Sequence, residues 1–146
     1  MANSTASAPV MQSAGNGHAK RFQLAVASSA QAPERARAWL RNVSEWMPPD
    51  AEQTVTLLVS ELVTNAVRHG GAGENDLIEL ELRTLDGGLS VSVSDPGPGF
   101  APSERDAPLD EPGGWGLVLV DQLAERWGVV HDERTRVWFE LAIPAG

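Results

Sequence analysis

The sequence predicts an α+β fold, a two-layer sandwich of one sheet and one layer of helices. Short segments in which apolar and polar residues alternate are typical of strands, and two longer segments carry apolar residues at helical spacing. Most of the expected strands follow one another as hairpins, and the two longer helices are adjacent in the chain. The expected order, β-α-α-β-β-loop-α-β-β, is typical of such a sandwich.

The first half of the expected fold contains one strand and two helices. Apolar residues alternate with polar or small ones over 22–26, which predicts a strand. A helix with a basic character follows and ends at the prolines of 48–49. The next helix has Asp50 as its expected N-cap and ends near His69, before two glycines. The expected buried face of the first helix is formed by Ala36, Leu40, Val43 and Met47.

The second half contains four strands and a short helix. The residues of 86–88, Asp-Gly-Gly, indicate a hairpin turn between the first two of these strands. A long loop is expected over 95–114, which is rich in Gly, Pro and acidic residues, and a short helix over about 116–124. The strands themselves are expected at 77–84, 89–94, 127–130 and 137–143.

The composition excludes several classes of function. The chain has 146 residues, 20 acidic and 11 basic, for a net charge of −9, and this acidity argues against nucleic-acid binding. Cysteine is absent, which excludes disulfides, thiolate metal sites and cysteine nucleophiles. The charge is unevenly divided: 20–49 holds five basic and two acidic residues, a net +3, whereas 50–146 holds six and eighteen, a net −12.

The first 19 residues differ from the rest. They are mainly small and polar, with little apolar content, so we expect a disordered tail before a domain at 20–146. They lack the charged start and apolar stretch of a signal peptide, and no apolar run in the chain approaches the roughly 20 residues that span a bilayer. We therefore expect cytoplasmic residence and no membrane partner.

The second expected helix carries a polar pair opposite its apolar stripe. Glu61 and Asn65 are four residues apart and are therefore neighbours on the helix surface. A carboxylate beside an amide oxygen suits Mg²⁺, and a carboxylate can also act as a general base. The alternative is a solvated polar face without a function. The apolar stripe is formed by Val55, Leu58, Val59, Leu62 and Ala66.

Two glycine-rich segments follow. Asp95 ends a strand and precedes Gly97 and Gly99, so its carboxylate could accept a hydrogen bond from a purine amine while the glycines let the backbone approach a ligand. The alternative is a Pro/Gly turn with a solvated Asp.

The second segment, Gly113-Gly114-Trp115-Gly116, leads into a helix with no acidic residue in its first turn. Free backbone N–H groups at such a helix N-terminus bind anions, whereas the alternative is a loop that simply ends at a helix. No G-K-[ST] sequence is present, so this is not a Walker loop.

In order and spacing, the three segments resemble the N, G1 and G2 boxes of the GHKL (Bergerat-fold) ATPase superfamily of gyrase, histidine kinases and mismatch-repair ATPases. The short chain, the ELVTNAVRHG helix and the closing RWGVV and RVWFEL segments are similar to the anti-sigma-factor serine/threonine kinases, in their compact actinomycete form. The resemblance covers about 20–146. It implies a mostly antiparallel mixed sheet that is covered on one face by about three helices.

The resemblance also implies roles for particular residues. Glu61 would be the general base that activates the attacking hydroxyl, and Asn65 would bind the Mg²⁺ that bridges the ATP phosphates. Asp95 would accept a hydrogen bond from the adenine amine. Further ATP contacts are implied for Gly97, Gly99, Gly113, Gly114, Gly116 and Leu117.

The function implied by the resemblance is that of a kinase. It would use ATP·Mg²⁺ to phosphorylate Ser or Thr on an anti-anti-sigma antagonist and would sequester a sigma factor, with homodimerisation also implied. The alternative is a non-catalytic ATP-binding interaction module, which Pro96 and Trp115 favour because they depart from the usual box residues. Arg35, Arg37 and Arg41 suggest a docking surface for an acidic partner, or else a solvated basic face.

Overall fold

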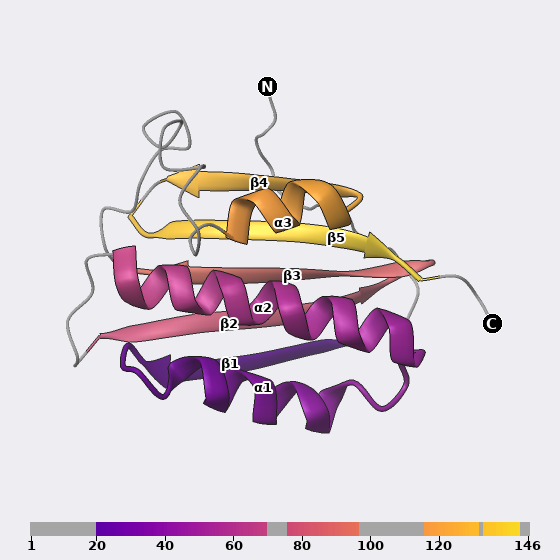
Figure 1. Cartoon of the computed structure of the whole chain (residues 1–146), viewed down its shortest axis with the longest axis horizontal. Coiled ribbons are helices and arrows are strands. Elements are labelled where there is room, and N and C mark those ends of the chain that lie inside the picture. The colour runs from indigo at the N-terminus through magenta and orange to yellow at the C-terminus, as the bar shows by residue number, and fades with distance from the viewer. Residues whose placement is uncertain (1–19, 70–75, 97–115, 132, 144–146) are drawn as a thin grey trace.

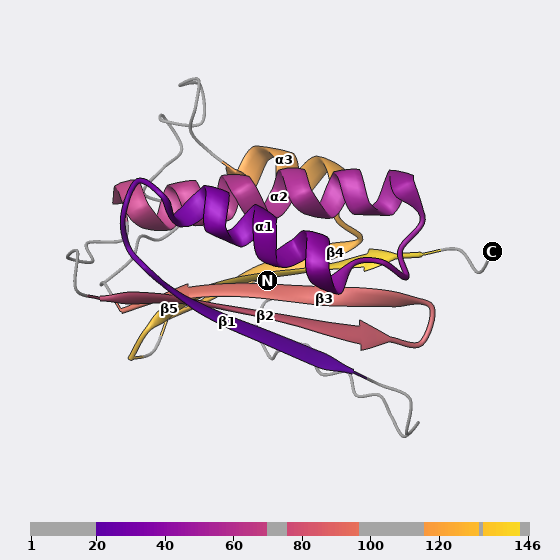
Figure 2. The same ribbon diagram turned by 90° about the horizontal axis from the view of Figure 1, so that it is seen from below.

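The computed structural model describes residues 20–69, 76–96, 116–131 and 133–143, and these form a five-stranded sheet with three helices on one face (Figures 1 and 2). The predicted two-layer α+β sandwich is therefore confirmed. The predicted tail, 1–19, lies outside the described residues. The helices are α1 (Ala32–Val43), α2 (Pro49–His69) and α3 (Gly116–Leu123). The strands are β1 (Arg21–Ala27), β2 (Leu77–Leu85), β3 (Gly88–Asp95), β4 (Arg126–His131) and β5 (Thr135–Ala142).

The sheet has the strand order β1-β2-β3-β5-β4, and each of these neighbouring pairs is antiparallel. The expectation of a mixed sheet is thus wrong for the described strands, because β2–β3 and β4–β5 are hairpins and the remaining neighbours also run in opposite directions. The predicted hairpin turn is confirmed. Gly87 has a φ of 82°, which favours glycine, and a Cβ on Gly88 would collide with the carbonyl oxygen of Leu141.

The two faces of the sheet differ sharply. Strand residues that face the helices are apolar and buried, as in the Val91 and Val93 positions of β3 and the Phe139 position of β5. The residues between them lie on the face without helices and are mainly polar, because side chains alternate along a strand. On the three central strands these outer residues include Glu79, Glu81, Arg83, Ser90, Ser92, Ser94, Arg136, Trp138 and Glu140.

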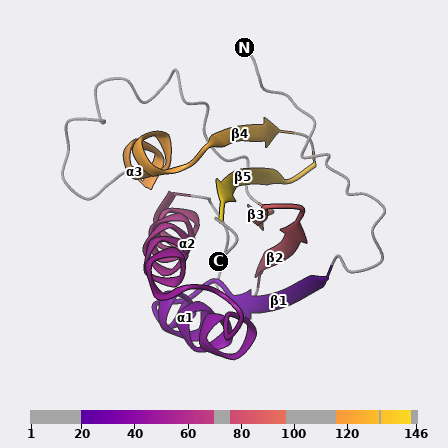
Figure 3. The same ribbon diagram turned by 90° about the vertical axis from the view of Figure 1, so that its right-hand side faces the viewer.

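Helix α2 is the central helix of the second layer. It lies between α1 and α3 and contacts both of them as well as the sheet (Figure 3). The predicted apolar stripe from Val55 to Ala66 is buried, which confirms that prediction. Val63 is also fully buried, on a helix that has a neighbouring helix on each side.

The link between α1 and α2 differs from the expectation. Helix α1 ends at Val43, so Met47 is buried beyond the helix and not on its face. The Trp46 indole N–H donates to the carbonyl oxygen of Val43 at 2.8 Å and so satisfies a C-terminal carbonyl of α1. Helix α2 begins at Pro49, which places Asp50 in its first turn instead of before it, where a negative charge still favours the helix.

Candidate functional site

The candidate site lies at one end of the molecule, which we call the site end. The last turn of α2, the end of β3 and the first turn of α3 all lie there (Figure 1). The start of β5 is also at this end, because Asp95 and Thr135 are paired across β3 and β5. The fold therefore brings the described part of each predicted motif segment, which includes Asn65, Asp95 and Gly116, to the site end.

Glu61 and Asn65 lie one turn apart on α2, but their environments differ. The Asn65 side chain is buried, with 3% of the residue exposed, and it makes a polar interaction. The solvated-face alternative is therefore wrong for Asn65. Glu61 is half-buried, and its carboxylate has no hydrogen-bond or ion-pair partner among the described residues. Next to it, the Arg37 guanidinium donates to the Ser60 hydroxyl at 3.3 Å and joins α1 to α2.

Asp95 is the last residue of β3 and is buried, with 6% exposed. Alternation along the strand puts it on the same side as Val91 and Val93, facing the helix layer. A buried carboxylate is costly unless it is bonded, and Asp95 does make a polar interaction. The alternative of a turn with a solvated Asp is therefore wrong.

Thr135 is a polar residue of this site that the sequence reasoning missed. It is the first residue of β5, is 3% exposed, and is the cross-strand partner of Asp95. Thr135 also takes part in an interaction of its own. Alternation back from Val137 and Phe139 would have placed Thr135 on the helix-facing side, but its pairing with Asp95 depends on strand register, which is not local in sequence.

Helix α3 begins at Gly116, and no acidic residue lies in its first turn. This confirms the expected short helix. Leu117 is buried with 4% exposed, and α3 packs on α2. The Trp127 indole N–H donates to the Asp121 carboxylate at 3.0 Å, which ties α3 to β4. The other predicted contact glycines, Gly97, Gly99, Gly113 and Gly114, lie outside the described residues.

The described side chains at the site end could supply only some of the ligands of a metal ion. In the described ranges, no group of three or more acidic or histidine side chains could hold a metal ion. Asn65 and Glu61 offer hard oxygen donors one helical turn apart, which fit Mg²⁺ when other ligands come from phosphates and water. The residues present therefore fit a magnesium ion that arrives with a nucleotide.

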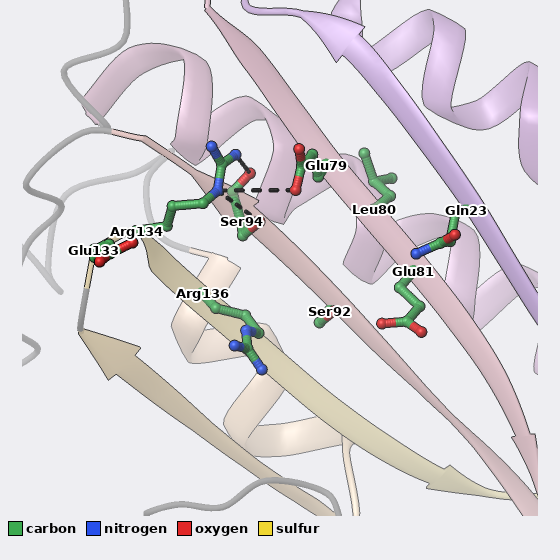
Figure 4. A pocket seen from close by; sticks show the side chains of 9 residues that line it. All are labelled: Gln23, Glu79, Leu80, Glu81, Ser92, Ser94, Glu133, Arg134 and Arg136. Atoms are coloured by element: carbon green, nitrogen blue, oxygen red, sulfur yellow. Dashed lines mark hydrogen bonds and ion pairs between the residues drawn. The ribbon is translucent and has the colours of Figure 1, made fainter.

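A separate hollow of about 530 Å³ lies on the face of the sheet without helices (Figure 4). Polar residues of β1, β2, β3 and β5 line it, among them Glu81, Ser92 and Arg136, and it includes none of the predicted site residues. Several of its charges are already paired, as in the 2.7 Å contact between Arg21 and Glu81. We therefore place the candidate site at Asn65 and Asp95, on the opposite face of the sheet.

The fold and these motif positions define a class of protein. Residues 22–141 match the family model described as histidine kinase-like ATPase domain, and the chain belongs to this family. It is a GHKL-type ATPase domain, and within that class it is related to the serine-protein kinases named RsbW. None of the helices in the described part of the chain is both long and apolar enough to cross a membrane.

The relatives give the extent of this similarity. The serine-protein kinases RsbW of Listeria innocua serovar 6a and Listeria monocytogenes serotype 4a are each 32% identical over 100 residues, which cover 60% of this chain and 64% of theirs. The match thus spans less than two thirds of the length of these relatives. A solved structure of the RsbU and RsbW domains of Rv1364c from Mycobacterium tuberculosis has a TM-score of 0.68 at 20% identity, covering 87% of this chain and 33% of that one, which shows the same fold.

Proposed function

We propose that the chain binds ATP with Mg²⁺ and is a serine/threonine kinase of the anti-sigma-factor type. In this proposal it phosphorylates an anti-anti-sigma partner and sequesters a sigma factor. The observation that carries it is the burial of Asn65 and Asp95, which are polar, engaged in interactions and at the same end of the sandwich. Membership of the histidine kinase-like ATPase family and similarity to serine-protein kinases support the choice of ATP.

Each residue has a part in the proposed reaction. The Asp95 carboxylate accepts a hydrogen bond from the adenine amine, which orients the nucleotide. Asn65 supplies an amide oxygen to Mg²⁺, which when bound neutralises charge on the phosphates. Gly116 and Leu117 present backbone N–H groups at the start of α3 to the phosphate chain.

Glu61 is the proposed general base. Its carboxylate is half-buried and without a partner among the described residues, so it is available to accept the proton of an attacking serine or threonine hydroxyl. The hydroxyl oxygen then bonds to the terminal phosphorus of ATP, and the bond to the leaving ADP oxygen breaks. Phosphoryl transfer of this kind needs positioning and charge neutralisation more than covalent catalysis.

The substitution Glu61→Ala tests the catalytic proposal. We expect it to retain ATP binding and to lower phosphoryl transfer roughly 100- to 10,000-fold, the usual contribution of a positioned base. The assay follows label from ATP to serine on a co-encoded antagonist domain. Glu45→Ala is the matched control, because Glu45 is exposed in the link between α1 and α2, and this variant should transfer at the wild-type rate. Equal rates in the Glu61 variant and wild type would rule out Glu61 as the base.

The second candidate function is a non-catalytic ATP-binding interaction module. Pro96 favours it, because a proline directly after Asp95 stiffens the backbone and removes an N–H donor. In this case ATP binds but no label reaches the antagonist from either wild type or variant. The same assay therefore separates the two candidates.

The proposed partners would dock at surfaces that charge alone suggests. Arg35 and Arg41 are exposed on α1, whereas Arg37 is half-buried and bonded to Ser60. A docking surface for an acidic partner is therefore restricted to Arg35 and Arg41. Homodimerisation remains an expectation from the family resemblance.

A further inference from the structure

We propose that Arg134 is a positioning residue for the nucleotide site. In this inference its guanidinium fixes the end of β3 and the start of β5, so that Asp95 and Thr135 keep their places at the adenine. The inference rests on the proposed ATP site, because it assigns Asp95 the role of base contact. Its hydrogen bonds to Ser94 and to the carbonyl oxygen of Leu77 let it act on Asp95 through the backbone.

The contacts of Arg134 join three separate segments of the chain. Its Nε donates to the Ser94 hydroxyl at 3.3 Å, and one Nη donates to the Ser94 carbonyl oxygen at 3.2 Å. The same Nη donates to the carbonyl oxygen of Leu77, the first residue of β2, at 3.0 Å. Figure 4 shows the side chain reaching from the β4–β5 turn across the end of β3 toward Glu79.

These contacts lie directly beside the buried pair. The Ser94 carbonyl belongs to the peptide bond whose nitrogen is that of Asp95, so holding this carbonyl restrains the backbone of Asp95. Arg134 itself precedes Thr135, the cross-strand partner of Asp95. Both members of the pair are therefore covalently next to a residue that takes part in the same cluster of hydrogen bonds.

An ordinary surface ion pair is the competing interpretation of Arg134. Its contact with Glu79 is long, at 3.9 Å, and the Glu79 side chain is 55% exposed, so that pair contributes little. The bonds to two backbone carbonyls and a hydroxyl differ, because they need several N–H donors in a fixed planar fork. Lysine offers a single point charge and would not reproduce them.

The first test compares the affinities for ATP and GTP, because an anchored Asp95 should discriminate between the two bases. We expect Arg134→Gln to weaken ATP binding roughly three- to tenfold and to lower the ratio of ATP to GTP affinity by a similar factor. Arg134→Lys should show most of this loss. Isothermal titration calorimetry with each nucleotide and Mg²⁺ measures both affinities.

Arg126→Gln is the matched control. Arg126 also lies on the outer face and also uses its guanidinium for two hydrogen bonds, both to Glu140, at 3.1 and 2.8 Å. Its strand partner is at the other end of β5 from Thr135. The Arg126→Gln variant should leave both affinities within about twofold of wild type, because the lost contacts with Glu140 lie far along β5 from Asp95 and Thr135.

The second test does not depend on nucleotide. Hydrogen exchange of the ligand-free proteins should be faster in Arg134→Gln at Asp95 and Thr135, by roughly tenfold, and unchanged there in the Arg126 variant. If wild type binds no ATP but exchange is faster, the proposed function fails and the anchoring stands. If ATP binds and the Arg134 variants match the control in affinity ratio and exchange, the inference is overturned.

Discussion

Asn65 and Asp95 illustrate why a polar residue must be judged by its burial. In the sequence both residues could be interpreted as solvated, and Asn65 was assigned to the side opposite the apolar stripe of α2. At about 100° per residue, however, Asn65 lies only about 20° around the helix from Leu58, at the edge of that stripe. In the structure both residues are almost fully buried. Helical spacing predicts that Glu61 and Asn65 are neighbours and that Asn65 is closer to the apolar stripe, but it does not predict that Asn65 is almost fully buried. That burial depends on tertiary packing.

The substitution Asp95→Asn tests the residue assigned to adenine. It keeps the shape of the side chain but replaces an acceptor oxygen by a donor NH₂, which cannot accept from the adenine amine. We expect ATP affinity to fall about 10- to 100-fold, the range for a hydrogen bond to a charged group. Titration calorimetry measures this change.

Asp86→Asn is the control for that substitution, because Asp86 is exposed in the β2–β3 hairpin turn. It should bind ATP like wild type. An Asp95→Asn protein that is folded and binds ATP with unchanged affinity would remove Asp95 from the site.

At the scale of elements, the strands and the β2–β3 hairpin were largely predictable because their signals are local. Alternation marks each strand, and the Asp-Gly-Gly sequence marks the turn, where Gly87 has its positive φ. Met47 was assigned to the wrong element because helical spacing continued past the end of α1. Thr135 was missed because its place beside Asp95 depends on the pairing of β5 with β3, which is far away in the sequence.

Two adjacent leucines of α2 test the packing of the central helix. Leu58 is fully buried, whereas Leu57 is 42% exposed. Leu58→Ala should lower the free energy of unfolding by about 2–5 kcal/mol, because it leaves a cavity between α2 and the rest of the core. Leu57→Ala should cost less than about 1 kcal/mol. Denaturant titration measures both values, and equal losses would contradict the assigned orientation of α2.

At the scale of the whole molecule, the basic and acidic parts of the sequence correspond to different elements of the fold. The net +3 of 20–49 comes from Lys20, β1, α1 and the link after α1, whereas the net −12 of 50–146 comes from the following residues, which include almost all of α2. An acidic body that binds a polyanion must neutralise phosphate locally. Arg68 is exposed near the end of α2, and Arg105 lies outside the described residues. The acidity thus favours a site that needs Mg²⁺.

The most direct test of the central claim, an ATP·Mg²⁺ site at Asn65 and Asp95, is thermal unfolding of the wild-type protein with and without saturating ATP and Mg²⁺. A ligand at about 100 times its dissociation constant stabilises the native state by about 2.7 kcal/mol, so we predict a clear rise in Tm. Removal of Mg²⁺ with a chelator should reduce this rise, as should Asp95→Asn. A Tm that ATP and Mg²⁺ leave unchanged in wild type would contradict the claim.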